Sequence, residues 1–278
     1  MPLDPAAVPV VILCGGRGSR FQEETQFRPK PMIEIGDRPI LWHIMKSYHH
    51  HGFRRFILCL GYLGESIRQF FLSYRSSVLN LTVALGSNDI QVHATDGLPE
   101  LDPESGWVVS LIDTGRDAMT GARVKRIEPW IDTEHFALTY GDGLTDMDLA
   151  RALEEHGSHG RVGTVTGVRP PGRFGELVLS GDPVGGEAAP VTEFSEKPQT
   201  RVGSINGGFF FFKRDFFTYL DADSRCVLEK EPLERLAADG QLMALRHVGF
   251  WQCMDTQRDR DYLESLWREG RAPWRVWA

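Results

Sequence analysis

The feature that most constrains this chain is a short apolar run followed at once by a glycine-rich turn, over residues 10–18. The run Val-Val-Ile-Leu at 10–13 does not alternate between polar and apolar residues, which is typical of a strand buried on both faces of a parallel sheet. Gly15, Gly16 and Gly18 allow a tight turn and leave backbone N–H groups accessible to a ligand. We therefore expect a central strand whose carboxyl end binds an anion such as phosphate.

Two cations follow the glycine-rich turn and support an anion site. Arg20 and Lys30 supply positive charge, and Pro29 and Pro31 restrict the backbone on either side of Lys30. Taken alone, the glycine cluster is equally consistent with an ordinary turn. The dinucleotide fingerprint G-x-G-x-x-G does not fit, because Phe21 stands where its last glycine is needed, and the Gly-Lys-Ser/Thr of a P-loop is absent.

Composition limits the kind of ligand and the compartment. The chain has 278 residues and a net charge of −7, which predicts one large domain that binds neither nucleic acid nor a membrane surface. We therefore expect a small-molecule partner. The four cysteines form no C-x-x-C motif, and no segment resembles a signal peptide or a membrane span, so we expect a reducing, cytoplasmic location.

The order of elements predicts an α/β fold with a mixed, mostly parallel central sheet. Strands and helices alternate up to about residue 157, with a first helix expected from Asp37, a possible cap, to the stop at Gly52. Later segments read as strands separated by Pro/Gly turns, so we expect a smaller β-rich region there. We divide the chain into residues 8–157, which contain the candidate anion site, and residues 158–278, the β-rich part with a C-terminal helix, as two parts of one continuous domain.

Two aspartates far apart in sequence are candidate metal ligands. Asp142 follows the predicted strand 136–140, where ligands bind in open α/β sheets, and Asp255 precedes the last predicted helix. Mg²⁺ prefers a few carboxylates together with phosphate oxygens and water. This pattern indicates a phosphoryl-type transfer in which Mg²⁺, Arg20 and Lys30 neutralise two polyanions. Alternatively, Asp142 forms an ordinary turn and Asp255 caps a helix.

A further basic helix is expected over residues 119–130, where Thr120, Gly121 and Arg123 stand at its start. A helix that begins beside the site would present its N-terminus to an anion. An ordinary helix with a solvated basic face explains the pattern equally well.

Longer motifs resemble the sugar-nucleotide pyrophosphorylases, and most closely the cytidylyltransferase branch of that family. The motifs that carry the resemblance span nearly the whole chain: GGRGSRFQEETQFRPKPM (15–32), TYGDG (139–143), PPGRFGEL (170–177), FSEKP (194–198), INGGFF (205–210) and GFWQCMDTQRD (249–259). The resemblance implies a Rossmann-like nucleotidyltransferase fold and a Mg²⁺-dependent transfer of the cytidylyl group of CTP to α-D-glucose 1-phosphate, giving CDP-glucose and pyrophosphate. It also implies a homo-oligomer, a trimer or a hexamer.

The resemblance also implies roles for individual residues. Arg20 and Lys30 would be catalytic, and Asp142 and Asp255 would bind Mg²⁺. The nucleotide would be bound by Leu13, Gly15, Gly16, Gly18, Ser19, Arg20, Lys30, Thr120, Gly121, Arg123 and Gly141. The sugar phosphate would be bound by Tyr140, Gly175, Glu196, Lys197 and Asn206. The chain departs from the family pattern at Cys14, Ser19 and Phe21, and its loop at 95–106 is longer than expected.

Two alternatives to this function remain. The same chemistry would serve another nucleotide, such as UTP or dTTP, or another sugar 1-phosphate, because fold does not fix the substrate. A non-catalytic, nucleotide-sensing subunit would be expected to lack Lys30 or one of the aspartates, and all three are present.

Overall fold

The computed structural model describes residues 2–18, 21–74, 80–87, 89–93, 106–169, 176–179, 191–195 and 204–277. Five residues with predicted roles lie outside these ranges: Ser19, Arg20, Gly175, Glu196 and Lys197. Residues 95–105 of the long loop lie outside them as well. The roles of these residues stay predictions.

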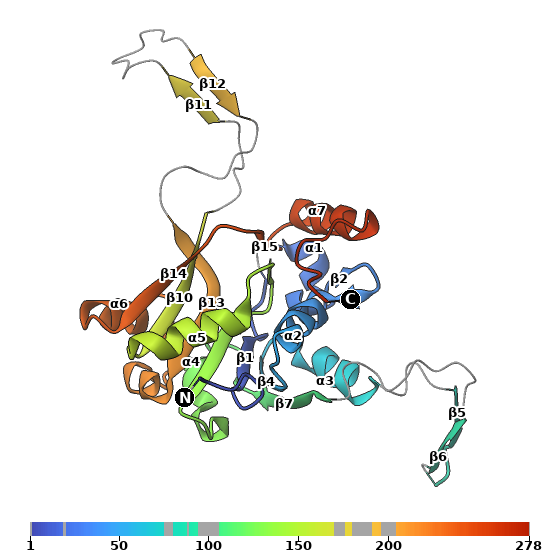
Figure 1. Ribbon diagram of the computed structural model, residues 1–278. Coiled ribbons are helices and arrows are strands. Elements are labelled where there is room, and N and C mark those ends of the chain that lie inside the picture. The colour runs from blue at the N-terminus through green and yellow to red at the C-terminus, as the bar shows by residue number, and fades with distance from the viewer. Residues whose placement is uncertain are drawn as a thin grey trace.

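A seven-stranded sheet forms the centre of the molecule, in the order β14-β10-β13-β8-β1-β4-β7 (Figure 1). Its strands are β1 (Val10–Leu13), β4 (Arg55–Leu60), β7 (Val108–Asp113), β8 (His135–Tyr140), β10 (Gly163–Val168), β13 (Ile205–Lys213) and β14 (Leu242–His247). All neighbours pair in parallel except β13, which is antiparallel to both β8 and β10. β1 is an interior strand with all four residues buried, so the predicted α/β class and its mostly parallel sheet are confirmed.

Helices cover both faces of the sheet, and alternate residues of β1 show the two layers. Val10 and Ile12 belong to one buried cluster, and Val11 and Leu13 belong to the other. The first cluster includes residues of α2 (Ile40–His50), α3 (Gly64–Leu72), α5 (Leu149–His159) and α7 (Gln257–Arg268). The second includes residues of α4 (Thr120–Arg126), the 3₁₀ helix η6 (Arg214–Tyr219) and α6 (Glu231–Ala238). The shorter helices are α1 (Gln22–Thr25), η2 (Lys30–Met32) and η5 (Glu128–Trp130).

The sheet continues across residue 157. β10, β13 and β14 come after this position and share the sheet with β1. The four phenylalanines at 209–212 are all buried and alternate between the two clusters, which confirms the prediction that they form core. The two predicted parts of the chain therefore share one sheet and both buried clusters.

Four further strand pairs form small sheets of their own. They are β2 (Glu34–Ile35) with β3 (Arg38–Pro39), β5 (Asn80–Ala84) with β6 (Asp89–His93), β9 (Gly143–Thr145) with β15 (Trp251–Cys253), and β11 (Glu176–Leu179) with β12 (Val191–Ser195). The β9–β15 pair matters for function, because it joins the segment after β8 to the segment before α7.

The predicted start of the first long helix was wrong. Helix α2 begins at Ile40, Pro39 occupies its N-cap position, and no side chain caps it. Asp37 instead lies in the turn between β2 and β3, where Gly36 has a φ of +66°. The hairpin pairs Ile35 with Arg38, so residues 38–39 are extended and the helix starts after them.

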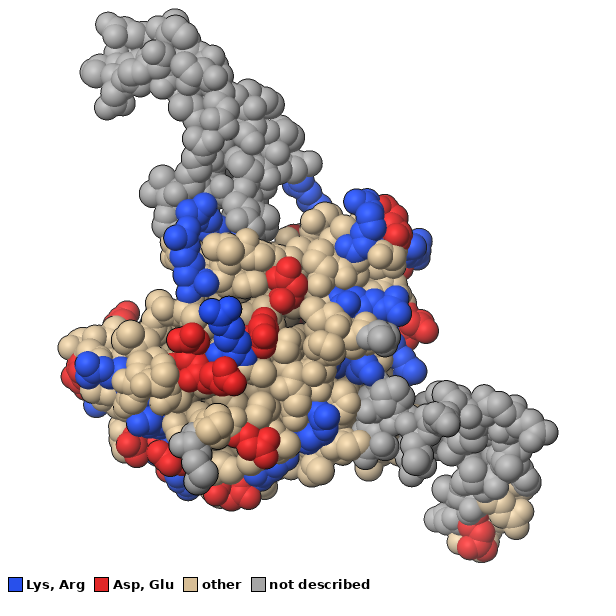
Figure 2. All heavy atoms as spheres, viewed as in Figure 1, with Lys and Arg blue, Asp and Glu red and all other residues tan. Residues whose placement is uncertain are grey.

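No helix in the described ranges is long and apolar enough to cross a lipid bilayer. On the face drawn in Figure 2, acidic and basic side chains are interspersed over the body of the molecule.

Candidate active site

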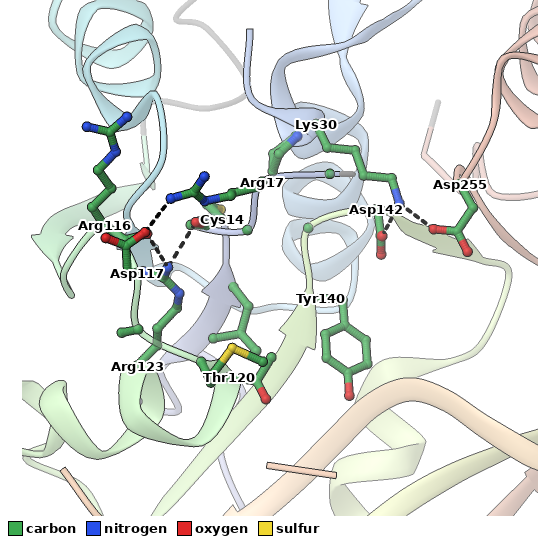
Figure 3. Close-up of a pocket in the computed structure, with 18 residues that line it drawn as sticks. Cys14, Arg17, Lys30, Arg116, Asp117, Thr120, Arg123, Tyr140, Asp142 and Asp255 are labelled. Atoms are coloured by element: carbon green, nitrogen blue, oxygen red, sulfur yellow. Dashed lines mark hydrogen bonds and ion pairs between the residues drawn. The ribbon is translucent and has the colours of Figure 1, made fainter. Parts of the chain in front are cut away.

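A cavity of about 540 Å³ opens where β1 and β8 end. β1 lies between β4 and β8 in the sheet. From β1 the chain continues to β4 on one side, and it later returns to β8 on the other side. Open α/β sheets bind ligands at such a switch point. The cavity brings together eleven residues with predicted roles (Figure 3): Leu13, Gly15, Gly16, Gly18, Lys30, Thr120, Arg123, Tyr140, Gly141, Asp142 and Asp255. Gly121 and Asn206 are not among its lining residues.

The three glycines of the turn serve different purposes. A Cβ at Gly15 would collide with the Arg123 guanidinium, and Gly18 has a φ of +60° with the Thr25 methyl 2.7 Å from its Cβ position. The fold itself therefore requires a glycine at both positions. At Gly16 a Cβ would meet nothing within 4 Å, although this residue lines the cavity. Gly16 is thus the glycine whose missing side chain leaves room for a ligand.

The ammonium group of Lys30 lies between two carboxylates at one side of the cavity. Its Nζ is 2.6 Å from Asp142 Oδ2 and 2.6 Å from Asp255 Oδ1 (Figure 3). The three side chains are 12%, 25% and 16% exposed, so the charges are partly shielded from water. Burial, the largest single influence, acts to lower the pKa of Lys30, but the two carboxylates outweigh it and raise that pKa above its usual value. Lys30 is therefore a permanent cation in this site.

Strand pairing explains why two aspartates so far apart in sequence meet. β9 and β15 pair in antiparallel register with Gly143 opposite Cys253, and the Met254 N–H donates to the Asp142 carbonyl at 2.9 Å. Asp142 and Asp255 therefore leave the same end of one small sheet. The backbone N–H of Asp255 also donates to Asp259 Oδ2 at 3.0 Å.

A capping box fixes the start of the helix that follows Asp255. The Thr256 hydroxyl accepts the Asp259 N–H at the N-cap, while the Asp259 carboxylate accepts the Thr256 N–H at 2.8 Å. Asp259 thus holds both the helix terminus and the backbone of Asp255. The geometry brings the predicted pair of acidic residues together, as the sequence suggested.

The two aspartates fit a magnesium ion as protein ligands. They already share one cation, the Lys30 ammonium, so both carboxylates point to a common place. In the described part of the chain no group of three or more His, Cys, Asp and Glu side chains is arranged to hold a metal by itself. Two carboxylates completed by phosphate oxygens and water suit Mg²⁺, which seldom uses an all-protein cage.

Arg123 lines the cavity, and its hydrogen bonds go to other parts of the protein. Its guanidinium is buried and donates to the carbonyls of Gly15 and Leu60 at 2.9 and 3.0 Å, and to the Thr114 hydroxyl at 2.8 Å. Burial lowers its pKa from the usual value. These contacts hold the backbone of the glycine-rich turn in position. A contact of Arg123 with the nucleotide stays a prediction.

The start of α4 also differs in part from expectation. Thr120 lines the cavity, and its hydroxyl donates to Glu229 Oε2 at 2.7 Å. Gly121 instead faces away, because a Cβ there would lie 2.6 Å from Cys226 Sγ and 3.0 Å from the Cys226 carbonyl. Gly121 therefore allows α4 to pack closely on a neighbouring segment.

Sequence reasoning missed two charged contacts near the cavity. Arg17 of the glycine-rich turn pairs with Asp117 at 2.6 Å, and both residues line the cavity. The position of Arg17 between Gly16 and Gly18 was a signal that could have found it. Glu229, which contacts Thr120 and Tyr140, stands in a charged segment without any motif, so its place became visible only in the fold.

The sheet order and the glycine-lined cavity with Lys30 are typical of proteins that bind a small, phosphate-bearing ligand at the ends of parallel strands. Family models agree with this class. The "Nucleotidyl transferase" model matches residues 108–264, and the "MobA-like NTP transferase domain" model matches residues 10–114.

Similar proteins of known family cover almost the whole chain. It is 45% identical over 268 residues to a glucose-1-phosphate cytidylyltransferase of Salmonella typhi, covering 96% of this chain and 98% of that protein. It is 40% identical to a probable glucose-1-phosphate cytidylyltransferase of Bacillus subtilis, with 96% and 99% covered. The chain belongs to the nucleotidyltransferase family, among the glucose-1-phosphate cytidylyltransferases.

Solved structures share the fold at low identity. A putative glucose-1-phosphate thymidylyltransferase from Bacillus anthracis superposes with a TM-score of 0.65 at 16% identity, covering 94% of this chain and 96% of that chain. A UDP-glucose pyrophosphorylase in complex with UDP-glucose gives a TM-score of 0.65 at 15% identity, with 95% and 99% covered. These likenesses confirm the Rossmann-like nucleotidyltransferase fold.

Proposed function

We propose that this protein transfers the cytidylyl group of CTP to α-D-glucose 1-phosphate, giving CDP-glucose and pyrophosphate. The observation that carries the proposal is the Lys30 ammonium held beside Asp142 and Asp255 at one side of a glycine-lined cavity. Family membership supports the choice of substrates, since relatives with 45% and 40% identity over 96% of the chain carry this activity in their names.

In this reaction an oxygen of the sugar phosphate attacks the α-phosphorus of CTP, and pyrophosphate leaves. A phosphate nucleophile is already deprotonated, so no general base is needed, and catalysis rests on position and charge. Repulsion between two unit charges about 4 Å apart amounts to roughly 4 kcal/mol at intermediate dielectric. We propose that Lys30 and Arg20 offset this repulsion by holding the triphosphate.

The glycine-rich turn has a separate task in the proposed mechanism. The bare backbone at Gly16 lets the nucleotide approach closely, and Arg123 beneath Gly15 keeps the turn in place. Asp142 and Asp255 would hold Mg²⁺. When bound, Mg²⁺ supplies charge neutralisation between the triphosphate and these carboxylates.

Three further features are part of the proposal. We expect Glu196, Lys197 and Asn206 to bind the sugar phosphate, because amide and carboxylate groups suit sugar hydroxyls and an ammonium suits phosphate. We also propose a homo-oligomer and a cytoplasmic location.

A nucleotide panel tests the choice of base. Purified protein with Mg²⁺ and glucose 1-phosphate is incubated with CTP, UTP, dTTP, ATP or GTP, and pyrophosphate release is followed, with a control that lacks the sugar phosphate. We expect CTP to give the highest kcat/KM. Faster release with UTP, dTTP, ATP or GTP would overturn the base assignment.

A further inference from the structure

A hydrogen-bonded group of side chains centred on Glu229 lies beside the cavity. The Thr120 hydroxyl donates to Glu229 Oε2 at 2.7 Å, and the Tyr140 hydroxyl donates to Glu229 Oε1. Thr120 and Tyr140 line the cavity from α4 and from the end of β8. Glu229 is exposed, precedes α6 and has no part in the mechanism described above.

Backbone contacts fix the position of Glu229. The segment before it is attached to the first turn of α4, because the Met119 N–H donates to the Ser224 carbonyl at 2.8 Å and the Ala122 N–H to the Cys226 carbonyl at 3.1 Å. The Leu228 N–H donates to the Thr120 hydroxyl oxygen at 2.9 Å. The glutamate is therefore presented to the cavity wall by a segment that hydrogen bonds hold to α4.

The hydroxyl protons of Thr120 and Tyr140 both point to Glu229, so acceptor atoms remain at the cavity wall. Each hydroxyl has one proton, and both Thr120 and Tyr140 give theirs to the carboxylate, which is acceptor-only when ionised. The Thr120 oxygen is already engaged by Leu228. The Tyr140 oxygen accepts one long hydrogen bond, from Asn206 Nδ2 at 3.5 Å, and a phenolic oxygen can accept a second. The Tyr140 oxygen thus retains a lone pair for a donor.

Charge separates this wall from the phosphate end of the site. The Thr120 and Tyr140 hydroxyl groups point away from the Lys30 ammonium (Figure 3). In the proposed mechanism Lys30 holds the phosphates, whereas the negative charge of Glu229 disfavours them at the opposite wall. A neutral group rich in hydrogen-bond donors suits that wall, and hexose hydroxyls are such donors.

We propose that Glu229 is a positioning residue that keeps the Tyr140 oxygen an acceptor for one hydroxyl group of the hexose. The inference rests on the proposed function, because it takes a sugar 1-phosphate as the substrate. The inference adds that the Tyr140 oxygen recognises that hydroxyl group because the Tyr140 proton is directed to Glu229.

Glu229→Gln tests this orientation, because the amide nitrogen would donate to the Tyr140 oxygen and turn the phenolic proton toward the cavity. Glucose 1-phosphate and its 2-, 3-, 4- and 6-deoxyfluoro analogues are compared by kcat/KM, since fluorine replaces the donor by a group that cannot donate. In the wild type we expect one analogue to lose about tenfold or more, the scale of one unmade hydrogen bond. In Glu229→Gln the loss at that same position should shrink to about threefold or less.

Two further variants complete the design. Glu231→Gln is the matched control, because its exposed carboxylate lies two residues away and contacts Arg235 at 3.7 Å; it should keep the wild-type pattern. Tyr140→Phe removes the acceptor itself and should abolish the discrimination at the same position. Comparing the loss for the same analogue, relative to glucose 1-phosphate, between variants cancels the electronic effect of fluorine.

Unchanged position-specific losses in Glu229→Gln and Tyr140→Phe would overturn the inference. A uniform loss for every sugar with a lowered melting temperature would also overturn it, because it would show a merely structural role. Failure of the proposed function looks different: the wild type would then release no pyrophosphate with glucose 1-phosphate and any nucleotide.

Discussion

The charge of Lys30 is the residue-scale feature on which the site depends. Its ammonium lies 2.6 Å from both Asp142 and Asp255, so removing it leaves two carboxylates facing each other. We expect Lys30→Met to lower pyrophosphate release by about 100-fold or more, the scale of one preorganised electrostatic contact. Added Mg²⁺ should raise the melting temperature of this variant more than that of the wild type, because the ion replaces the missing cation.

Lys213→Met is the control for that substitution, since the Lys213 ammonium donates to the Gly160 carbonyl and does not line the cavity. Its pyrophosphate release should match the wild type. Wild-type turnover in Lys30→Met would show that Lys30 has no catalytic role.

The glycine-rich turn offers a matched pair of substitutions at the same scale. A Cβ at Gly16 meets nothing, so Gly16→Ala should change stability by no more than about 0.5 kcal/mol while raising the KM for CTP about tenfold. A Cβ at Gly15 collides with Arg123, so Gly15→Ala should lower the free energy of unfolding by roughly 1–3 kcal/mol. The melting temperature should therefore fall by several degrees. Thermal melting and steady-state kinetics measure both. A normal KM for CTP in Gly16→Ala would place the nucleotide elsewhere.

At the scale of elements, the link between β15 and α7 positions Asp255. Asp259 accepts the N–H groups of Asp255 and Thr256 but does not line the cavity. We expect Asp259→Ala to cost about 1 kcal/mol through loss of the cap and to lower kcat about tenfold through a displaced Asp255. Asp261→Ala, an exposed carboxylate on the same helix, should have neither effect. An unchanged kcat in Asp259→Ala would show that the cap serves stability alone.

At this scale the sequence predicted features that depend on neighbouring residues in the chain or on the position of a strand end. β1, its turn and Lys30 lie in one short stretch of the sequence, and Asp142 follows a recognisable buried strand, so their common place at one sheet edge could be inferred. The partners of Arg123 could not be inferred, because its carbonyl contacts come from segments that only the fold brings together.

Glu229 was missed for the same reason. Its position depends on how residues 224–228 pack on α4, and packing between distant segments has no short sequence signature. Asp37 shows the opposite error, in which a sequence signal predicted a feature that did not form. Asp37 precedes an apolar helix face and so resembles a cap, but the short β2–β3 hairpin occupies residues 34–39 and the helix begins only at Ile40.

At the scale of the whole molecule, buried histidines make the fold sensitive to acid. His135, at the opposite end of β8 from Tyr140, lies 3.1 Å from His156 Nε2, and the other nitrogen of His156 lies 2.8 Å from the Thr164 hydroxyl. Burial, with smaller contributions from His135 and His159, lowers the pKa of His156 to about 3. The same residue in the unfolded chain has a pKa of about 6.5.

Between these values the unfolded chain binds a proton that the folded chain does not, so stability falls as the pH drops below about 6.5. His156 alone should lower the free energy of unfolding by about 2 kcal/mol between pH 7 and pH 5. His156→Gln should make that decline shallower in urea titrations, whereas the exposed His50→Gln should not. An equally steep decline in His156→Gln would remove this residue as the cause.

The most direct test of the central claim is a crystal structure of the protein with Mn²⁺ and a non-hydrolysable CTP analogue. We predict one anomalous peak at the roughly 2.1 Å distance of a small divalent cation from both Asp142 and Asp255, with the triphosphate completing its coordination. The Lys30 ammonium should then contact a phosphate oxygen. A metal bound away from these two carboxylates, with Lys30 still paired to both of them, would contradict the proposed site.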